Sequence, residues 1–93
     1  MKISGNVIQF KSENEFYQKE KSGLKSNTAR FMTTLDDIKA MEFFKVQFSV
    51  TNDATIIIIN KDNDEQFVRK ITDISQYPGT WLYMISWSSA VVD

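Results

Sequence analysis

Residues 55–60 read "TIIIIN", and this run of four isoleucines decides the fold class of the chain. Successive side chains of a strand point to opposite faces, so a strand that is apolar at every position must be covered on both faces. Such a strand lies between two layers or inside a closed barrel. We therefore predict a buried strand at residues 55–60.

The segments on either side of this run carry further strand and turn signals. "KVQFSVT" places Val46, Phe48 and Val50 at alternate positions, which predicts a half-buried antiparallel strand. Short polar or Pro-Gly segments interrupt the C-terminal half and predict turns. The pattern predicts strands at 45–51, 65–74 and 81–87, with turns at 51–54, 61–64 and 76–80.

A helix is predicted in the first third of the chain. Ser12 and Glu15 have the spacing of a capping box, so this helix should begin near Ser12. Gly23 can adopt the left-handed conformation that ends a helix. Leu24 is in place for the hydrophobic contact that often follows such an end.

A second helix and two strands complete the predicted elements. Residues 3–10 are an opening strand in which Gly5 marks a bulge or a close approach. Residues 28–32, "TARFM", have the composition of a short strand. Thr34 is a suitable cap for a helix that follows it to residue 44, because two aspartates and apolar residues at three-residue steps come next.

The composition indicates one small domain without the commonest catalytic and metal-binding side chains. Ninety-three residues, 42% of them hydrophobic, are enough for a single core. The chain has no Cys and no His, so we expect no metal and no cofactor. About five to six strands and two short helices predict an α+β fold, a small antiparallel β-barrel formed by residues 1–93 as one domain.

The sequence shows no targeting or membrane segment. The first ten residues, "MKISGNVIQF", lack the apolar run of a signal peptide. No stretch approaches the roughly 18 apolar residues that a membrane span needs. We therefore expect a cytoplasmic protein with no membrane partner.

Charge is unevenly distributed, although the formal net charge is only −1. From Lys19 to Arg30 there are four cations and one anion, whereas from Phe31 to Val68 there are seven acids and three lysines. The basic segment is a solvated polar face or an anion-binding patch. The acidic segment suits a basic protein partner.

The acidic turn at residues 62–67 invites comparison with a calcium loop. Asp62 and Asp64 stand two apart like the first ligands of an EF-hand loop. The sixth position is then Phe67 where glycine is required, and Asp73 replaces the glutamate of the twelfth. We predict a solvated hairpin turn and no metal site.

Three aromatic residues in the last predicted strand allow two interpretations. Trp81, Tyr83 and Trp87 form a stacking platform for a base or sugar, or they belong to the core of a small domain. The core interpretation is favoured for Tyr83 and Trp87. Trp81 follows a Pro-Gly turn and should lie near the rim.

The stretch "KSGLKSNTARF", residues 21–31, carries the candidate site. Lys25 follows a helix end, where a cation is favourable in any case. In an extended segment Thr28 and Arg30 point the same way, so a hydroxyl and a planar five-donor fork face one volume. This grouping suits a phosphate, a carbonyl or a nucleobase edge.

These residues resemble a known family. A helix, then Gly23-Leu24-Lys25, then Thr28 and Arg30 ahead of an antiparallel strand set is similar to the ASCH domain of the PUA-like superfamily. The fuller string "KEKSGLKSNTARF" is also similar to small proteins encoded by phages and prophages of low-GC Gram-positive bacteria. If the chain is phage-encoded, its location is the host cytoplasm.

The resemblance implies a PUA-like barrel whose cleft binds RNA, DNA or a modified nucleoside. The cleft residues that follow from it, together with nearby cations and an amide, are Lys21, Lys25, Asn27, Thr28, Arg30 and Arg69. Some ASCH members resemble amidohydrolases that cleave acetylcytidine with a Lys and a Thr, which Lys25 and Thr28 match. Their glutamate lies on a late helical insertion that residues 72–83 are too short to form, and only Glu42 and Glu65 remain downstream.

Three functions therefore stay open. The first is a PUA-like module that binds nucleic acid or a nucleotide. The second is a phage-type accessory protein that binds and blocks a host protein with its acidic face. The third is an enzyme acting on a modified nucleoside with Lys25 and Thr28 as catalytic residues.

Overall fold

The computed structural model describes residues 1–89, and its secondary structure follows much of the predicted pattern. The elements in chain order are β1 (Lys2–Ser4), β2 (Val7–Ser12), α1 (Asn14–Ser22), β3 (Asn27–Phe31), α2 (Leu35–Thr51), β4 (Thr55–Asn60), β5 (Gln66–Gln76) and β6 (Leu82–Trp87). None of the described helices is long and apolar enough to cross a membrane.

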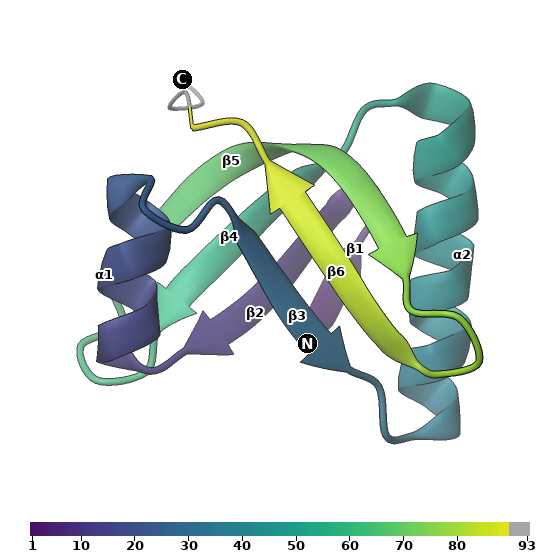
Figure 1. Cartoon of the computed structure of the whole chain (residues 1–93), viewed down its shortest axis with the longest axis horizontal. Coiled ribbons are helices and arrows are strands. Elements are labelled where there is room, and N and C mark those ends of the chain that lie inside the picture. The colour runs from purple at the N-terminus through teal and green to yellow at the C-terminus, as the bar shows by residue number, and fades with distance from the viewer. Residues whose placement is uncertain (90–93) are drawn as a thin grey trace.

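The six strands within residues 1–89 form one curled sheet with the strand order β1-β2-β4-β5-β6-β3. Neighbouring strands are antiparallel, except that β2 and β4 run parallel. Figure 1 shows the sheet curling between α1 and α2, which lie on opposite sides of it. The predicted α+β class with a small barrel-like sheet and two helices is confirmed. The sheet is mixed, however, and no backbone ladder joins its two ends within the described residues.

Strand β4 lies at the centre of the core. Ile56 and Ile58 are fully buried inside the curled sheet, whereas Ile57 and Ile59 on the outer face are half-buried. Burying each such side chain stabilises the fold by roughly 1.5–3 kcal/mol. The surrounding core contains Ile8, Phe10, Tyr17, Met32, Met41, Phe44, Ala54, Phe67, Ile71, Ile74, Tyr83, Ile85 and Trp87.

The predicted strand at residues 45–51 is wrong, because this segment continues helix α2. The helix is apolar on two sides: Phe44 is buried, while Val46 and Val50 are exposed. Apolar residues on both sides hide the 3.6-residue period of a helix. Val46, Phe48 and Val50 then imitate the two-residue period of a strand.

Two of the three predicted helix caps are confirmed, those of Thr34 and Gly23. Thr34 Oγ1 accepts a hydrogen bond of 3.1 Å from the Asp37 N–H at the start of α2. Gly23 ends α1 with a φ of 87°, in the left-handed region. The predicted packing of Leu24 is wrong, because its side chain is 85% exposed.

The short elements agree with the sequence pattern in outline. The predicted opening strand divides into β1 and β2 at a turn that contains Gly5. Strand β3 occupies most of the predicted segment 28–32. The acidic segment between β4 and β5 is a turn in which Asn60 Oδ1 accepts a hydrogen bond of 2.9 Å from the Asp62 N–H.

Arg30 bridges the two sides of the curled sheet where β3 approaches β2. Its Nη1 donates to the Lys11 carbonyl oxygen at 3.0 Å, and its Nη2 donates to Ser12 Oγ at 2.8 Å. Its Nε donates to Thr28 Oγ1 in its own strand at 3.0 Å. The guanidinium also lies over the Phe10 ring, 4.8 Å from the centroid. We call this junction the Arg30 seam.

The Arg30 seam forms where β2 has a free edge. Strand β1 pairs with residues 7–9 of β2 and leaves the carbonyl of Lys11 beyond the end of the ladder. This carbonyl therefore has no partner in the β1–β2 ladder, and the guanidinium donates to it instead.

The predicted capping role of Ser12 is wrong for the same reason. Helix α1 begins at Asn14, and its N-cap residue Glu13 makes no side-chain capping bond. Ser12 is the last residue of β2, and its hydroxyl accepts from Arg30. The capping-box spacing is therefore present without the cap.

Replacing Arg30 with methionine should lower the free energy of unfolding by about 1.5–3 kcal/mol, the range for hydrogen bonds to charged groups. Arg30→Lys should lose less, because it keeps the charge but not the planar fork. Urea unfolding measures both, with Lys39→Met on the exposed surface of α2 as the control. Equal midpoints for Arg30→Met and Lys39→Met would show that the seam adds no stability.

Tyr83 should make stability depend on alkaline pH. Its buried hydroxyl donates to the Glu42 carboxylate, and burial followed by this contact raises its pKa above the ordinary value of 10.0. The stabilising contribution of the protonated Tyr83 hydroxyl is therefore complete below about pH 10. It is lost as the pH rises further, because the tyrosine of the unfolded chain releases its proton at a lower pH than that of the folded chain.

Tyr83→Phe should remove this part of the alkaline loss. We expect a shallower fall of the urea midpoint between about pH 9 and 11 than in the wild type. Tyr77→Phe, which changes an exposed tyrosine, is the control. A wild-type slope in Tyr83→Phe would contradict the assignment.

Candidate functional site

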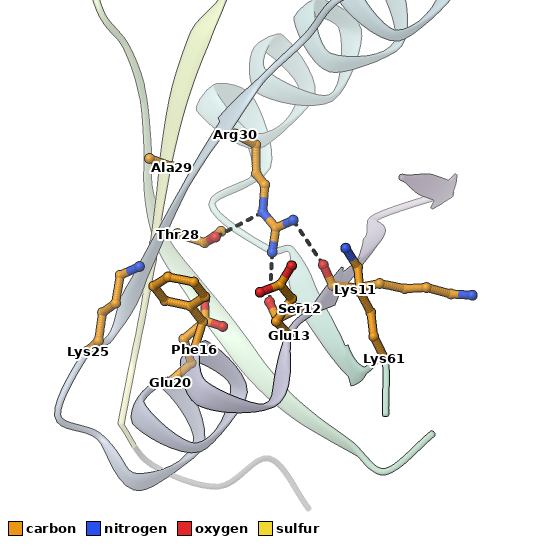
Figure 2. Close-up of a pocket in the computed structure, with 10 residues that line it drawn as sticks. All are labelled: Lys11, Ser12, Glu13, Phe16, Glu20, Lys25, Thr28, Ala29, Arg30 and Lys61. Atoms are coloured by element: carbon orange, nitrogen blue, oxygen red, sulfur yellow. Dashed lines mark hydrogen bonds between the residues drawn. The ribbon is translucent and has the colours of Figure 1, made fainter. Parts of the chain in front are cut away.

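A pocket of about 380 Å³ lies between α1, β3 and the end of β2, directly beside the Arg30 seam. Its volume is within the range of small-molecule sites. Four cations and two carboxylates line it, so its charge is net positive. The lining residues, drawn in Figure 2, are Lys11, Ser12, Glu13, Phe16, Glu20, Lys25, Thr28, Ala29, Arg30 and Lys61.

One face of α1 forms a wall of the pocket. Phe16 and Glu20 stand four residues apart, which places them on the same side of the helix, and the N-cap residue Glu13 lines the pocket just before it. Phe16 is 47% exposed and presents part of its ring to solvent. The Lys25 ammonium lies 5.4 Å from the centroid of this ring. A flat apolar surface therefore stands next to a cation.

The segment that leaves α1 forms the opposite wall. Gly23 turns the chain out of the helix, and Lys25, Thr28 and Arg30 all line the pocket. Thr28 and Arg30 share one side of β3, as their hydrogen bond shows. The structure thus brings these three sequence-predicted residues to one volume.

Glu20 is the most unusual group in the pocket. Its side chain is 1% exposed, and its Oε1 has no hydrogen-bond partner among the described residues. Buried carboxylates are normally paired or hydrogen-bonded, because leaving water is costly for a charge. An acceptor is therefore held in the pocket wall without a donor from the protein.

Glu20 acts electrostatically on Arg30. Burial lowers the pKa of the Arg30 guanidinium, and the negative charge of Glu20 opposes this shift. Arginine remains protonated at neutral pH in either case. Three of its five N–H groups serve the seam, so one N–H on each terminal nitrogen is left for a ligand.

The other predicted binding residues do not line this pocket. Arg69 is buried, donates to the Lys21 and Val68 carbonyl oxygens, and packs against Phe67. It ties β5 to the end of α1. Lys21 lies over the ring of Tyr17, with its ammonium 5.9 Å from the centroid. Asn27 begins β3 opposite Ser86 of β6.

The acidic segment of the sequence is divided among distant elements. Asp36 and Asp37 begin α2, Asp53 precedes β4 and pairs with Lys70, and residues 62–65 form the turn after β4. Figure 1 places the start of α2 and the β4–β5 turn on opposite sides of the molecule. The aspartates that begin α2 therefore lie apart from the acids of the β4–β5 turn. No group of three or more potential metal ligands occurs within residues 1–89.

The last strand contributes to the core and not to this pocket. Tyr83 and Trp87 are buried, in agreement with the core interpretation. Trp81 lies before β6 and is 45% exposed, as expected for a residue at the rim.

Sequence reasoning missed Glu20, Phe16, Lys11 and Lys61. The spacing of residues 16 and 20 on one helix face was available as a signal, but nothing in the sequence marks that face as a pocket wall. The Lys11 and Lys61 positions depend on the parallel pairing of β2 with β4, in which the Lys61 N–H donates to the Ser12 carbonyl oxygen at 2.9 Å.

No protein-family model, curated protein or solved structure matches the chain. The resemblance to ASCH domains therefore stays a prediction. The function has to be inferred from the geometry of the pocket.

Replacing Glu20 with glutamine should stabilise the ligand-free protein. The substitution keeps the shape and removes the charge of a buried carboxylate, so we expect a gain of about 1 kcal/mol. Glu15→Gln changes an exposed carboxylate on the same helix and should stay within about 0.5 kcal/mol of the wild type. A loss of stability in Glu20→Gln, measured by urea unfolding, would indicate a structural role instead.

Proposed function

We propose that this protein binds a nucleotide or a segment of nucleic acid, with the base in the pocket between α1 and β3. The observation that carries the proposal is the pairing of a buried, unpartnered carboxylate with a half-exposed aromatic ring in a pocket of net positive charge. Each part matches one chemical feature of such a ligand.

The ring and the carboxylate suit a nucleobase. Aromatic side chains stack on bases of any sequence, and Phe16 is an exposed aromatic residue in the pocket wall. A carboxylate accepts hydrogen bonds from the exocyclic amine of cytosine. Glu20 therefore favours cytosine over uracil, whose carbonyl oxygen at that position repels it.

The cations suit the phosphate. Lys25 and Lys61 line the pocket, and neither side chain makes an ion pair within the described residues. Arg30 adds its two remaining N–H groups. Thr28 is 3% exposed and accepts from Arg30, so its main contribution is to orient the guanidinium.

A titration with cytidine and uridine nucleotides tests the proposal. The wild type should bind cytidine monophosphate about tenfold or more tightly than uridine monophosphate, the discrimination expected from one charge-assisted hydrogen bond. Glu20→Met should remove most of this preference. Glu15→Met, on the exposed side of the same helix, is the matched control and should keep it.

Lys25→Gln provides a second readout. It should weaken binding of both nucleotides about equally, because the ammonium acts on charge and not on the base. Absence of nucleotide binding by the wild type, or an unchanged preference in Glu20→Met, would contradict the proposal.

One observation favours catalysis as a second candidate. Glu20 lines the same pocket as Lys25 and Thr28, whereas Glu42 is bonded to Tyr83 and Glu65 lies outside the pocket. Glu20, which precedes Lys25 and Thr28 in the chain, could therefore take the part of the catalytic glutamate for which the sequence showed no downstream candidate. A deacetylation assay on acetylcytidine tests this candidate: turnover that Thr28→Ala abolishes would support it, and no turnover by the wild type would exclude it.

A further inference from the structure

A second hollow, which we call the basic hollow, adjoins the pocket between α1 and β3, which we call the nucleobase pocket. It has a volume of about 450 Å³ and is lined by Met1, Lys2, Gln9, Phe10, Lys11, Arg30 and Lys61. Lys11, Arg30 and Lys61 line both spaces, so the Arg30 seam is their common wall. The basic hollow contains four cationic side chains and no carboxylate, unlike the pocket beside it.

Three separate parts of the chain supply the lysines of the basic hollow. Lys2 lies in β1, which pairs antiparallel with β2 and sets Lys2 opposite Gln9. Lys11 is two residues further along β2. Lys61 follows β4, which runs parallel to β2 and ends at the same place. The strand pairing therefore gathers charges that the sequence keeps 9 and 50 residues apart.

This gathering of charge is not balanced by the protein. The ion pairs formed within the described residues are Lys19 with Glu15 and Lys70 with Asp53, so the three lysines have none. Like charges held together destabilise the folded state, and they create a positive potential that attracts anions. The phosphate of a bound ligand would reduce the repulsion among these lysines.

We infer that the basic hollow binds the phosphate next to the recognised base. The inference rests on the proposed function and extends it: the ligand is a phosphorylated nucleotide or a single strand, and not a free nucleoside. Lys2, Lys11 and Lys61 bind the phosphate as point charges, Lys61 from the wall that the two spaces share. Arg30, from the common wall, offers its remaining N–H groups to the sugar-phosphate link between the two spaces.

Titrations with cytidine, its 5′- and 3′-monophosphates and a six-residue oligocytidylate test the inference. At low salt the wild type should bind one of the monophosphates about tenfold more tightly than cytidine. The double variant Lys2→Gln/Lys11→Gln should lose most of this advantage. Lys2→Gln alone, at a residue that does not line the nucleobase pocket, should keep the affinity for cytidine. Both side chains are exposed, and the seam uses only the backbone of Lys11, so the fold should persist.

The matched control is Lys39→Gln/Lys70→Gln, which removes the same charge from exposed positions outside both spaces. It should retain the preference for the monophosphate. The oligocytidylate distinguishes the two sources of phosphate. If the oligocytidylate binds more tightly than the monophosphate, and if the Lys2→Gln/Lys11→Gln variant reduces the slope of log affinity against log salt concentration by about 1–2, the ligand is a nucleic-acid strand. Equal binding indicates that the ligand is a free nucleotide.

Three results would overturn the inference. If cytidine binds as tightly as both monophosphates and the oligocytidylate, the proposed phosphate subsite is contradicted, whereas the proposed nucleobase pocket is not. An equal loss in the control variant would show that overall charge, and not the basic hollow, attracts the phosphate. No binding by any of these ligands would overturn the base pocket and the subsite together.

Discussion

The Arg30 guanidinium is the contact on which the rest of the structure depends. It replaces the missing backbone ladder between β3 and β2 with two hydrogen bonds and a contact to the Phe10 ring, while a third hydrogen bond to Thr28 orients it within β3. Only arginine combines a permanent charge with a planar set of five donors. Because these bonds reach the end of β2, they also fix where α1 begins relative to β3. The walls of both spaces follow from that one placement.

This role changes how the candidate site should be understood. Arg30 is largely occupied in holding the two walls, so recognition shifts to groups that the protein leaves unsatisfied. Glu20 keeps a buried oxygen without a donor, and Lys2, Lys11 and Lys61 keep charges without counterions in the described part of the chain. Groups of this kind lower the stability of the ligand-free protein and are typical of sites selected for binding.

Local signals in the sequence predicted a large part of the fold. Four isoleucines predicted the buried strand β4, and Thr34 and Gly23 marked helix ends that the structure confirms. Prediction failed where a local signal competed with a tertiary contact. Ser12 has the spacing of a helix cap, yet its hydroxyl accepts from Arg30, 18 residues away. Helix α2 is apolar on two sides, and its second half therefore has the period of a strand.

The candidate site was predictable only in part, for the same reason. Lys25, Thr28 and Arg30 are close in sequence, so their spacing alone indicated a common direction. Glu20 and the lysines of the basic hollow reach the site through the end of α1 and through parallel strand pairing, which no short stretch encodes. An NMR titration of the ¹⁵N-labelled protein with cytidine monophosphate tests the account most directly. We expect chemical-shift changes at Phe16, Thr28 and the Arg30 Nε–H, and none along α2. Changes confined to α2, or no changes at all, would contradict ligand binding beside the Arg30 seam.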